Sequence, residues 1–257
     1  MDPMPSRAAR HTTAALAVPV TLGLAQSLPA ATWLPTVRQL FPALAGRGII
    51  EHVALTFDDG PDPATTPALL DLLAAHGVRA TFFVVGERAR RHPGLIDEIH
   101  SGGHELAVHG WSHVDFLRLS PGAAAREVEH TAALLRKLTG RQPVWFRPPY
   151  GALSGTALWA SRRAGLRPVL WTAWARDWEA PEPTLIVRRL RDGGGPGGTV
   201  LLHDSPYGGA PGSDAACHAA VEVLLDVWRD DGRVVGPLAE HGVNPAGKRV
   251  ATGTHST

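Results

Sequence analysis

The chain has 257 residues, enough for one large α/β domain or two smaller ones. Its net charge is +1 and its pI about 8.1, so charge gives no argument for nucleic acid or for a strongly acidic partner. The single cysteine, Cys217, excludes an internal disulfide framework and is expected to be a small apolar residue on a helix.

Residues 1–48 are expected to form an N-terminal extension. Arg7 and Arg10 precede the apolar run 14–25, which has the outline of a signal peptide. Pro19 interrupts this run, which is also too short and mixed for a clear membrane span. An export signal or membrane anchor and a disordered extension are therefore equal alternatives, and secretion, membrane attachment and a cytoplasmic location stay open. Residues 32–48 are expected to be a linker that covers one face of the domain.

From residue 50 onward, apolar strand-like runs alternate with helical stretches. The expected strands are 52–57, 79–85, 104–108, 143–147, 167–174, 198–203 and 233–238, and the expected helices are 65–77, 88–103, 122–140, 154–166, 184–194 and 215–232. This alternation predicts parallel βαβ units, arranged as a barrel or as an open doubly wound sheet. Residues 49–242 would form a single catalytic domain, and 243–257 a polar, disordered tail.

Polar clusters follow five of the seven expected strands. In chain order they are DDG, HGWSH, RPPYG, RDW and HDS. Because the chemistry of parallel α/β folds lies beyond the carboxyl ends of the strands, these clusters are expected to converge in space. No G-x-G-x-x-G follows the first strand, which argues against a dinucleotide-binding fold.

Two of these clusters suggest a metal site. His109 and His113 have a separation of four, which suits a pair of metal ligands but is a weak signal alone, since two polar loop histidines would look the same. A carboxylate from TFDDG would complete a set of two histidines and one acid, which leaves positions open for water and substrate. Of the adjacent acids Asp58 and Asp59, one could then bind the cation while the other remains a base. A solvated turn is the alternative for this pair.

The ordered set TFDDG, HGWSH, RPPYG, RDW and LLHD resembles the five motifs of the polysaccharide deacetylases, the NodB-homology domain of carbohydrate esterase family 4. The resemblance spans about residues 50 to 240. It implies a distorted (β/α)7 barrel that uses one divalent metal ion, most often Zn²⁺, with Co²⁺, Ni²⁺ or Mn²⁺ as alternatives. The reaction that it implies is the removal of acetyl groups from N-acetylated sugars.

The resemblance also implies roles for individual residues. Asp58 would be the general base, oriented by Arg147, and His203 the general acid, held by Asp177. The metal ligands would be Asp59, His109 and His113. The backbone N–H of Tyr150 would stabilise the oxyanion, and Trp178 and Leu201 would receive the acetyl methyl group, with simple core packing as the alternative for these two.

Two positions depart from the family pattern. Gly110 stands where Ser or Thr usually follows the first histidine, so we expect altered loop packing with the metal ligands retained. Trp174 stands at the first acidic position of D-x-x-D-W. It is expected to reshape the cleft, which makes a polymer substrate less certain.

The sequence therefore predicts a metal-dependent hydrolase in which metal-activated water removes N-acetyl groups from an amino-sugar polymer or oligosaccharide, of chitin-oligomer or peptidoglycan type. The substrate is the expected partner, without nucleic acid or a partner protein, and the N-terminus could associate with a membrane. One alternative is a hydrolase of the same fold that cleaves a small cyclic amide or ureide. A second is an inactive carbohydrate-binding relic, which the complete residue set disfavours.

Overall fold

The computed structural model describes residues 23–243. Most of the predicted export signal or anchor lies outside this range. So does the predicted polar tail, except for its first residue. Within residues 23–243, no helix has both the length and the apolar character needed to cross a membrane.

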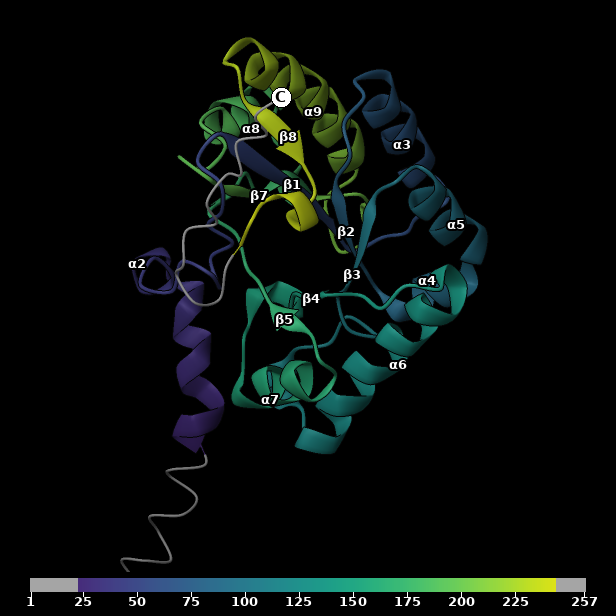
Figure 1. The fold of residues 1–257 in the computed structure, drawn as a ribbon, viewed down its shortest axis with the longest axis vertical. Coiled ribbons are helices and arrows are strands. Elements are labelled where there is room, and N and C mark those ends of the chain that lie inside the picture. The colour runs from purple at the N-terminus through teal and green to yellow at the C-terminus, as the bar shows by residue number, and fades with distance from the viewer. Residues whose placement is uncertain (1–22, 244–257) are drawn as a thin grey trace, which may run out of the picture.

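A curled sheet of parallel strands forms the centre of the molecule (Figure 1). Its strands are β1 (His52–Asp58), β2 (Thr81–Val84), β3 (Glu105–Val108), β4 (Trp145–Phe146), β5 (Arg167–Pro168), β6 (Ala173–Trp174), β7 (Thr199–His203) and β8 (Val234–Gly236). Their order is β5-β4-β3-β2-β1-β7-β6, and β8 pairs with the first half of β1. The distorted (β/α)7 barrel predicted from the sequence is confirmed.

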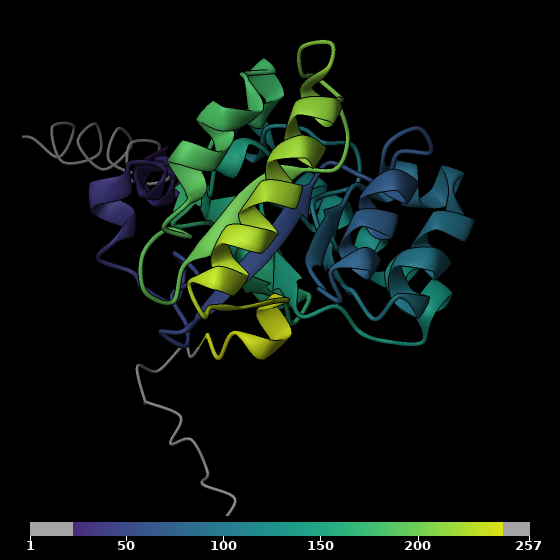
Figure 2. The same cartoon turned by 90° about the horizontal axis from the view of Figure 1, so that it is seen from above.

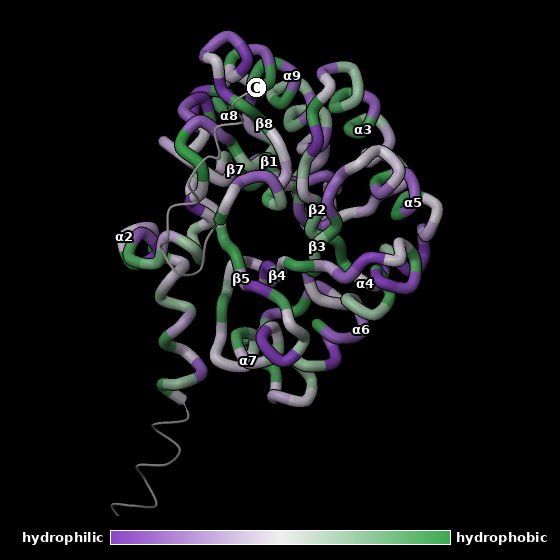
Figure 3. Tube along the Cα trace, viewed as in Figure 1, coloured by the Kyte–Doolittle hydropathy of each residue, from purple (hydrophilic) through white to green (hydrophobic). Residues whose placement is uncertain are grey.

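Helices surround this sheet on its outer side (Figures 1 and 2). They are α3 (Thr66–Ala75), α4 (Gly86–Arg91), α5 (Pro93–Ser101), α6 (Pro121–Thr139), α7 (Gly155–Arg163), α8 (Pro183–Leu190) and α9 (Ser213–Asp230). Hydrophobic and hydrophilic residues alternate along α6 and α9 (Figure 3), as expected for helices with one face on the sheet. Cys217 is buried on α9, as predicted.

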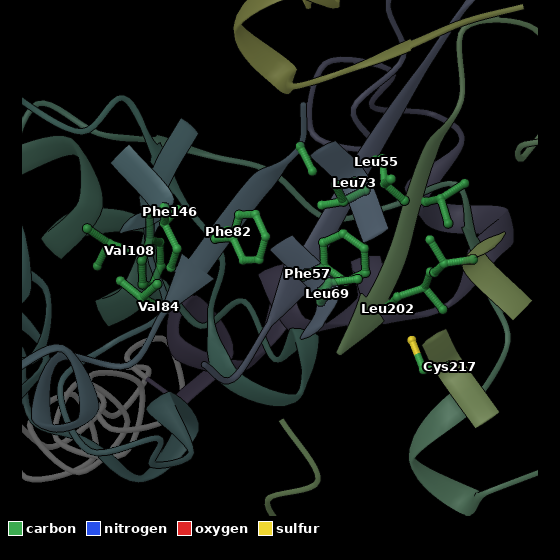
Figure 4. Close-up of a cluster of buried hydrophobic side chains, with 14 of the residues drawn as sticks. Leu55, Phe57, Leu69, Leu73, Phe82, Val84, Val108, Phe146, Leu202 and Cys217 are labelled. Carbon is green, nitrogen blue, oxygen red and sulfur yellow. The ribbon is translucent and has the colours of Figure 1, made fainter. Parts of the chain in front are cut away.

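Alternation along the strands separates two apolar layers. Leu55 and Phe57 of β1 face the helices, where they join Phe82, Val84, Val108 and Phe146 in the main core (Figure 4). Ala54 of β1 belongs to a second cluster, together with Phe83, Ala107, Trp145 and Val169. Because side chains alternate along a strand, Thr56 and Asp58 share the inner face of the barrel with Ala54.

The prediction of one continuous strand over 167–174 is wrong. The run is divided into β5, which pairs with β4, and β6, which pairs with β7. Between them, the N–H of Leu170 donates to the carbonyl of Leu44, 2.7 Å away, instead of to a neighbouring strand. The side chain of Arg147 donates hydrogen bonds to the carbonyls of Val169 and Leu170. The backbone polar groups of the break are thus satisfied by partners far away in the sequence.

The prediction of one helix over 88–103 is also wrong, because the helix breaks at His92. The following residue is Pro93, whose ring disfavours helical geometry at the preceding position. His92 has φ −128° and ψ 60°, outside the helical region, and α5 begins at Pro93. Proline is well suited to the first position of a helix because its missing N–H would be unpaired there.

The segment 27–47 packs against the break between β5 and β6. It contains the 3₁₀ helix η1 (Leu28–Trp33) and the short helix α2 (Pro35–Arg38), at the left of Figure 1. Arg47 donates to the carbonyls of Gly194 and Pro196, and Thr199 Oγ1 donates to the carbonyl of Gly46. Residues expected to be a linker therefore make specific contacts with segments far along the chain.

Candidate active site

The polar clusters that follow the strands lie around one cleft at the carboxyl end of the barrel. The cleft has a volume of about 490 Å³. Among the residues that line it are Asp58, Asp59, His109, His113, Tyr150, Trp178, Leu201 and His203. Arg147 and Asp177 are buried behind it. The structure thus brings together all ten residues that the sequence singled out.

Asp59, His109 and His113 form a compact group suited to a metal ion. One potential ligand atom from each lies within 4.8 Å of the others. Asp59 Oδ1 is 3.3 Å from His109 Nε2 and 3.0 Å from His113 Nε2. The structure describes no other such group within residues 23–243.

The protonation of His109 tests whether these residues suit a cation. Its Nδ1 lies 2.8 Å from the carbonyl oxygen of Arg147, and only an N–H can serve that acceptor. In the neutral ring, Nε2 then carries a lone pair and lies 3.3 Å from Asp59 Oδ1. That oxygen is buried and has no hydrogen-bond partner. A cation bound by both atoms would satisfy them, and a metal-bound histidine commonly donates its other ring N–H to a carbonyl, as His109 Nδ1 does here. The residues therefore fit a divalent metal.

The neighbouring imidazoles also set the charge of Asp59. Burial raises the pKa of this carboxyl, but the neighbouring imidazoles of His109, His113 and His203 outweigh burial and hold the pKa well below its ordinary value. Asp59 is therefore ionised at neutral pH, as a metal ligand must be.

Asp58 is held apart from this group by Arg147. Arg147 Nη1 lies 2.6 Å from Asp58 Oδ1 and 2.8 Å from Thr56 Oγ1. Burial lowers the pKa of Arg147, and the nearby Asp58 carboxylate opposes part of this shift. The other oxygen of Asp58, Oδ2, is 3.8 Å from His109 Nε2. One carboxylate oxygen is thus occupied while the second faces the cleft.

His203 is the last residue of β7, which pairs with β1 on the side away from β2 and β3. Asp58 and His203 are register partners on β1 and β7. His203 Nδ1 is 3.1 Å from Asp177 Oδ1, and its backbone N–H donates to Asp177 Oδ2. Burial lowers the pKa of His203, but Asp177 and the acids at Asp59 and Asp58 raise it to about 10. Its Nε2–H can then donate to a ligand in the cleft, and Nε2 lies 4.0 Å from Asp59 Oδ2.

Several residues around the cleft have a strained backbone. Among residues 23–243, five residues other than glycine have a positive φ: Asp59 (80°), His113 (53°), Tyr150 (60°), Arg176 (55°) and Ala180 (49°). All but Ala180 line the cleft. Such a conformation costs on the order of 1–3 kcal/mol at each residue and tends to occur at functional sites. The surrounding contacts therefore hold these side chains in fixed positions.

The loop that carries the two histidines is supported from α6. Gly110 has φ 81°, and Glu127 Oε2 accepts from the N–H groups of Trp111 and Ser112. Thr131 Oγ1 donates to the carbonyl of Gly110. The roles of Glu127 and Thr131 could not be predicted from the sequence, because nothing local distinguishes them from other helical residues that pack on a neighbouring segment.

A second support ties the TFDDG loop to the end of β7. Asp204 Oδ1 accepts from the N–H of Gly60, and its other oxygen accepts from Thr66 Oγ1. A Cβ at Gly60 would lie 1.9 Å from Asp204 Oδ2, so only glycine allows this approach. Asp204 thus fixes the position of the loop that carries Asp59.

The chain matches the polysaccharide deacetylase family model over residues 46–169. A chitooligosaccharide deacetylase of Rhizobium leguminosarum bv. trifolii is 39% identical over 136 residues, which are 53% of this chain and 63% of the relative. A peptidoglycan-N-acetylglucosamine deacetylase of Bacillus cereus is 35% identical over 151 residues, 58% of this chain and 54% of the relative. The matches thus span less than two thirds of these relatives.

A solved structure covers more of the fold. A peptidoglycan N-acetylglucosamine deacetylase superposes with a TM-score of 0.73 at 30% identity, over 80% of this chain and 95% of that chain. This likeness extends across nearly the whole of that relative.

Proposed function

Because the chain belongs to the polysaccharide deacetylase family, we propose that it is a metal-dependent hydrolase that removes N-acetyl groups from an amino-sugar oligomer or polymer. The observation that carries the proposal is the juxtaposition of the Asp59, His109 and His113 group with Asp58 on one side and His203 on the other. The relatives named as chitooligosaccharide and peptidoglycan deacetylases support this substrate class.

Asp59, His109 and His113 would hold the divalent cation. When bound, the cation would lower the pKa of water at the site and polarise the acetyl carbonyl. Zn²⁺ suits a site of two imidazoles and one carboxylate with an open position, and Co²⁺, Ni²⁺ and Mn²⁺ are alternatives.

Asp58 would act as the general base. Its Oδ2 lies near His109, while Oδ1 accepts a hydrogen bond from Arg147. Oδ2 is therefore available to take the proton of the attacking water. Arg147 would balance the charge of this carboxylate and fix its direction. The backbone N–H of Tyr150 would stabilise the negative charge that develops on the carbonyl oxygen.

His203 would complete the reaction as the general acid. Its Nδ1–H donates to Asp177, which leaves Nε2–H to protonate the sugar nitrogen as the C–N bond breaks. The products are acetate and a free amine. Leu201 and Trp178 line the cleft beside His203, with the Trp178 ring centroid 5.3 Å from that of His203, and would receive the acetyl methyl group.

The test is acetate release from chito-oligosaccharides and from peptidoglycan fragments, measured with zinc-loaded wild type and with Asp58→Asn. We expect Asp58→Asn to lower kcat by about 10²–10⁴-fold while metal binding is retained. Asp71→Asn, an exposed change on α3, is the matched control and should act as wild type. Hydrolysis of a cyclic amide or ureide without acetate release would instead support the alternative hydrolase. Metal binding with no hydrolysis of any amide or ester would support the relic.

A further inference from the structure

Four tryptophans form a connected wall along one side of the cleft. The ring centroid of Trp178 is 5.1 Å from that of Trp174, which is 5.6 Å from Trp171 and 6.0 Å from Trp33. All four line the same cleft as Asp59, His109 and His113. Trp33 comes from η1, outside the region that the family model matches.

The backbone that presents Trp33 is fixed by buried contacts. Arg38 is only 4% exposed, donates to the carbonyls of Thr32 and Trp33, and places its guanidinium 5.1 Å from the ring of Trp171. Upstream, Gln26 donates to the carbonyl of Phe116 and accepts from the N–H of Thr156. The segment is thus held at both ends.

The ring of Trp33 is itself available, with the residue 43% exposed. It meets Trp174 edge-on, at an interplanar angle of 87°, so it leaves ring surface open toward the cleft. An exposed tryptophan on a rigid segment costs little entropy when it binds a ligand. Its presence at the cleft therefore points to a ligand surface, and packing alone does not account for it.

Polar groups stand beside the aromatic surface. Arg176 and Glu179 are both exposed, pair at 3.1 Å and line the cleft, and the Arg176 guanidinium lies 5.5 Å from the Trp174 ring. A pyranose ring has apolar C–H faces and a rim of hydroxyl groups. Flat aromatic surface with a charged pair at its edge complements both features, since the rings cover the C–H face and the charged groups hydrogen-bond the hydroxyls.

We propose that Trp33 and Trp174 form an aromatic platform for a second sugar ring, adjacent to the ring whose acetyl group reacts, with one indole stacked on the sugar face and the other, perpendicular to it, against the sugar edge. The inference rests on the proposed function. Trp178 lies against His203, whereas Trp174 and then Trp33 lie successively further along the wall. The platform therefore reaches sugar beyond the reacting unit, which makes the substrate an oligosaccharide of at least two residues. Trp33 is a specificity-determining residue supplied by the N-terminal segment.

The test compares Trp33→Ala with wild type on two substrates, chitotetraose and 4-nitrophenyl acetate, which occupies only the acetyl site. We expect kcat/KM on the tetramer to fall about tenfold, mainly through KM, so that the ratio of tetramer to ester activity falls by a similar factor. Trp33→Phe, which keeps a flat ring, should recover most of this loss. Leu40→Ala is the control, because Leu40 is on the same segment and 74% exposed. An equal fall on both substrates, or no change on either, would overturn the proposal.

A binding measurement separates this proposal from the proposed function. Calorimetric titration of chitotetraose into zinc-loaded Asp58→Asn gives the affinity without turnover. Adding Trp33→Ala to this variant should weaken binding about tenfold, even if wild type releases no acetate. Equal affinities, or no binding by either variant, would overturn the platform. Absence of acetate release together with Trp33-dependent binding would overturn only the deacetylase activity.

Discussion

Arg147 donates to Asp58 over 2.6 Å, and the side chains of the pair are only 0% and 4% exposed. Lysine at this position would keep the charge. It would lose the planar guanidinium group, which also donates hydrogen bonds to Thr56 and to the carbonyl of Leu170. We expect Arg147→Lys to lower kcat/KM by about 100-fold and the free energy of unfolding by about 1–3 kcal/mol. Steady-state kinetics and thermal unfolding check both effects.

The control for this change is Arg163→Lys. Arg163 pairs with Glu129 at the same distance of 2.6 Å, but the side chains are 58% and 38% exposed. An exposed pair contributes little, so stability should change by less than about 1 kcal/mol. Similar losses in both variants would contradict a special role for the buried pair.

The proposed metal site is formed by three residues that come from two strand ends. Wild type dialysed against Zn²⁺ is expected to retain about one ion per chain, measured by elemental analysis, because two imidazoles and one carboxylate leave a position open to solvent. Asp59→Asn, His109→Ala and His113→Ala should each lose most of it. His130→Ala, an exposed histidine on α6, should bind as wild type. If the three variants retained as much zinc per chain as wild type, the metal would have to bind at another site.

The charge of His203 depends on Asp177. The Asp177 carboxylate raises the pKa of His203, so its removal lowers that pKa and the imidazolium is lost at lower pH. In Asp177→Asn, the alkaline limb of the profile of kcat/KM against pH should therefore move to lower pH, with a lower maximum rate. A pH–rate profile checks this. A uniform loss with an unmoved limb would indicate that Asp177 acts only on the geometry of the ring.

A buried pair of histidines at the opposite end of the barrel makes stability depend on pH. His52 Nδ1 and His241 Nδ1 are 2.8 Å apart, and His241 is fully buried. Burial and His52 lower the pKa of His241 from 6.5 to about 4. Between these values the unfolded chain binds more protons than the folded one, so stability is full above pH 6.5 and falls as the pH drops toward 4.

The expected size of this effect is about 1–2 kcal/mol between pH 7 and pH 5. Urea unfolding at both pH values measures it. His241→Gln should be less stable than wild type at pH 7 but show a smaller difference between the two pH values. His130→Gln, at an exposed position, should preserve the difference. An unchanged pH dependence in His241→Gln would exclude this histidine as its source.

The sequence predicted the convergence of the site because of a simple rule of topology. Parallel strands bring their carboxyl ends to one edge, so acids after β1 and histidines after β3 had to meet near His203 at the end of β7. Alternation along β1 then turned Asp58 toward the barrel interior, where the buried Arg147 reaches it. These features depend on order and periodicity, which a single sequence contains.

The sequence could not predict the contacts that arise only in three dimensions. Trp33 lies in a stretch with few periodic features, and its place at the cleft depends on the break between β5 and β6. That break in turn depends on Leu44 as a hydrogen-bond partner for Leu170. The supports from Glu127 and Asp204 likewise join a polar side chain to a distant backbone N–H, and neither partner carries a local signal.

The contacts of segment 27–47 constrain the order of events during synthesis. Arg47 is bonded to a residue 147 positions later, and Gly46 to one 153 positions later. At roughly 5–20 residues per second, the segment leaves the ribosome roughly 8–30 s before its partners exist. The first part of the structured chain to be made is therefore among the last to dock, and its apolar residues stay accessible to chaperones throughout that interval.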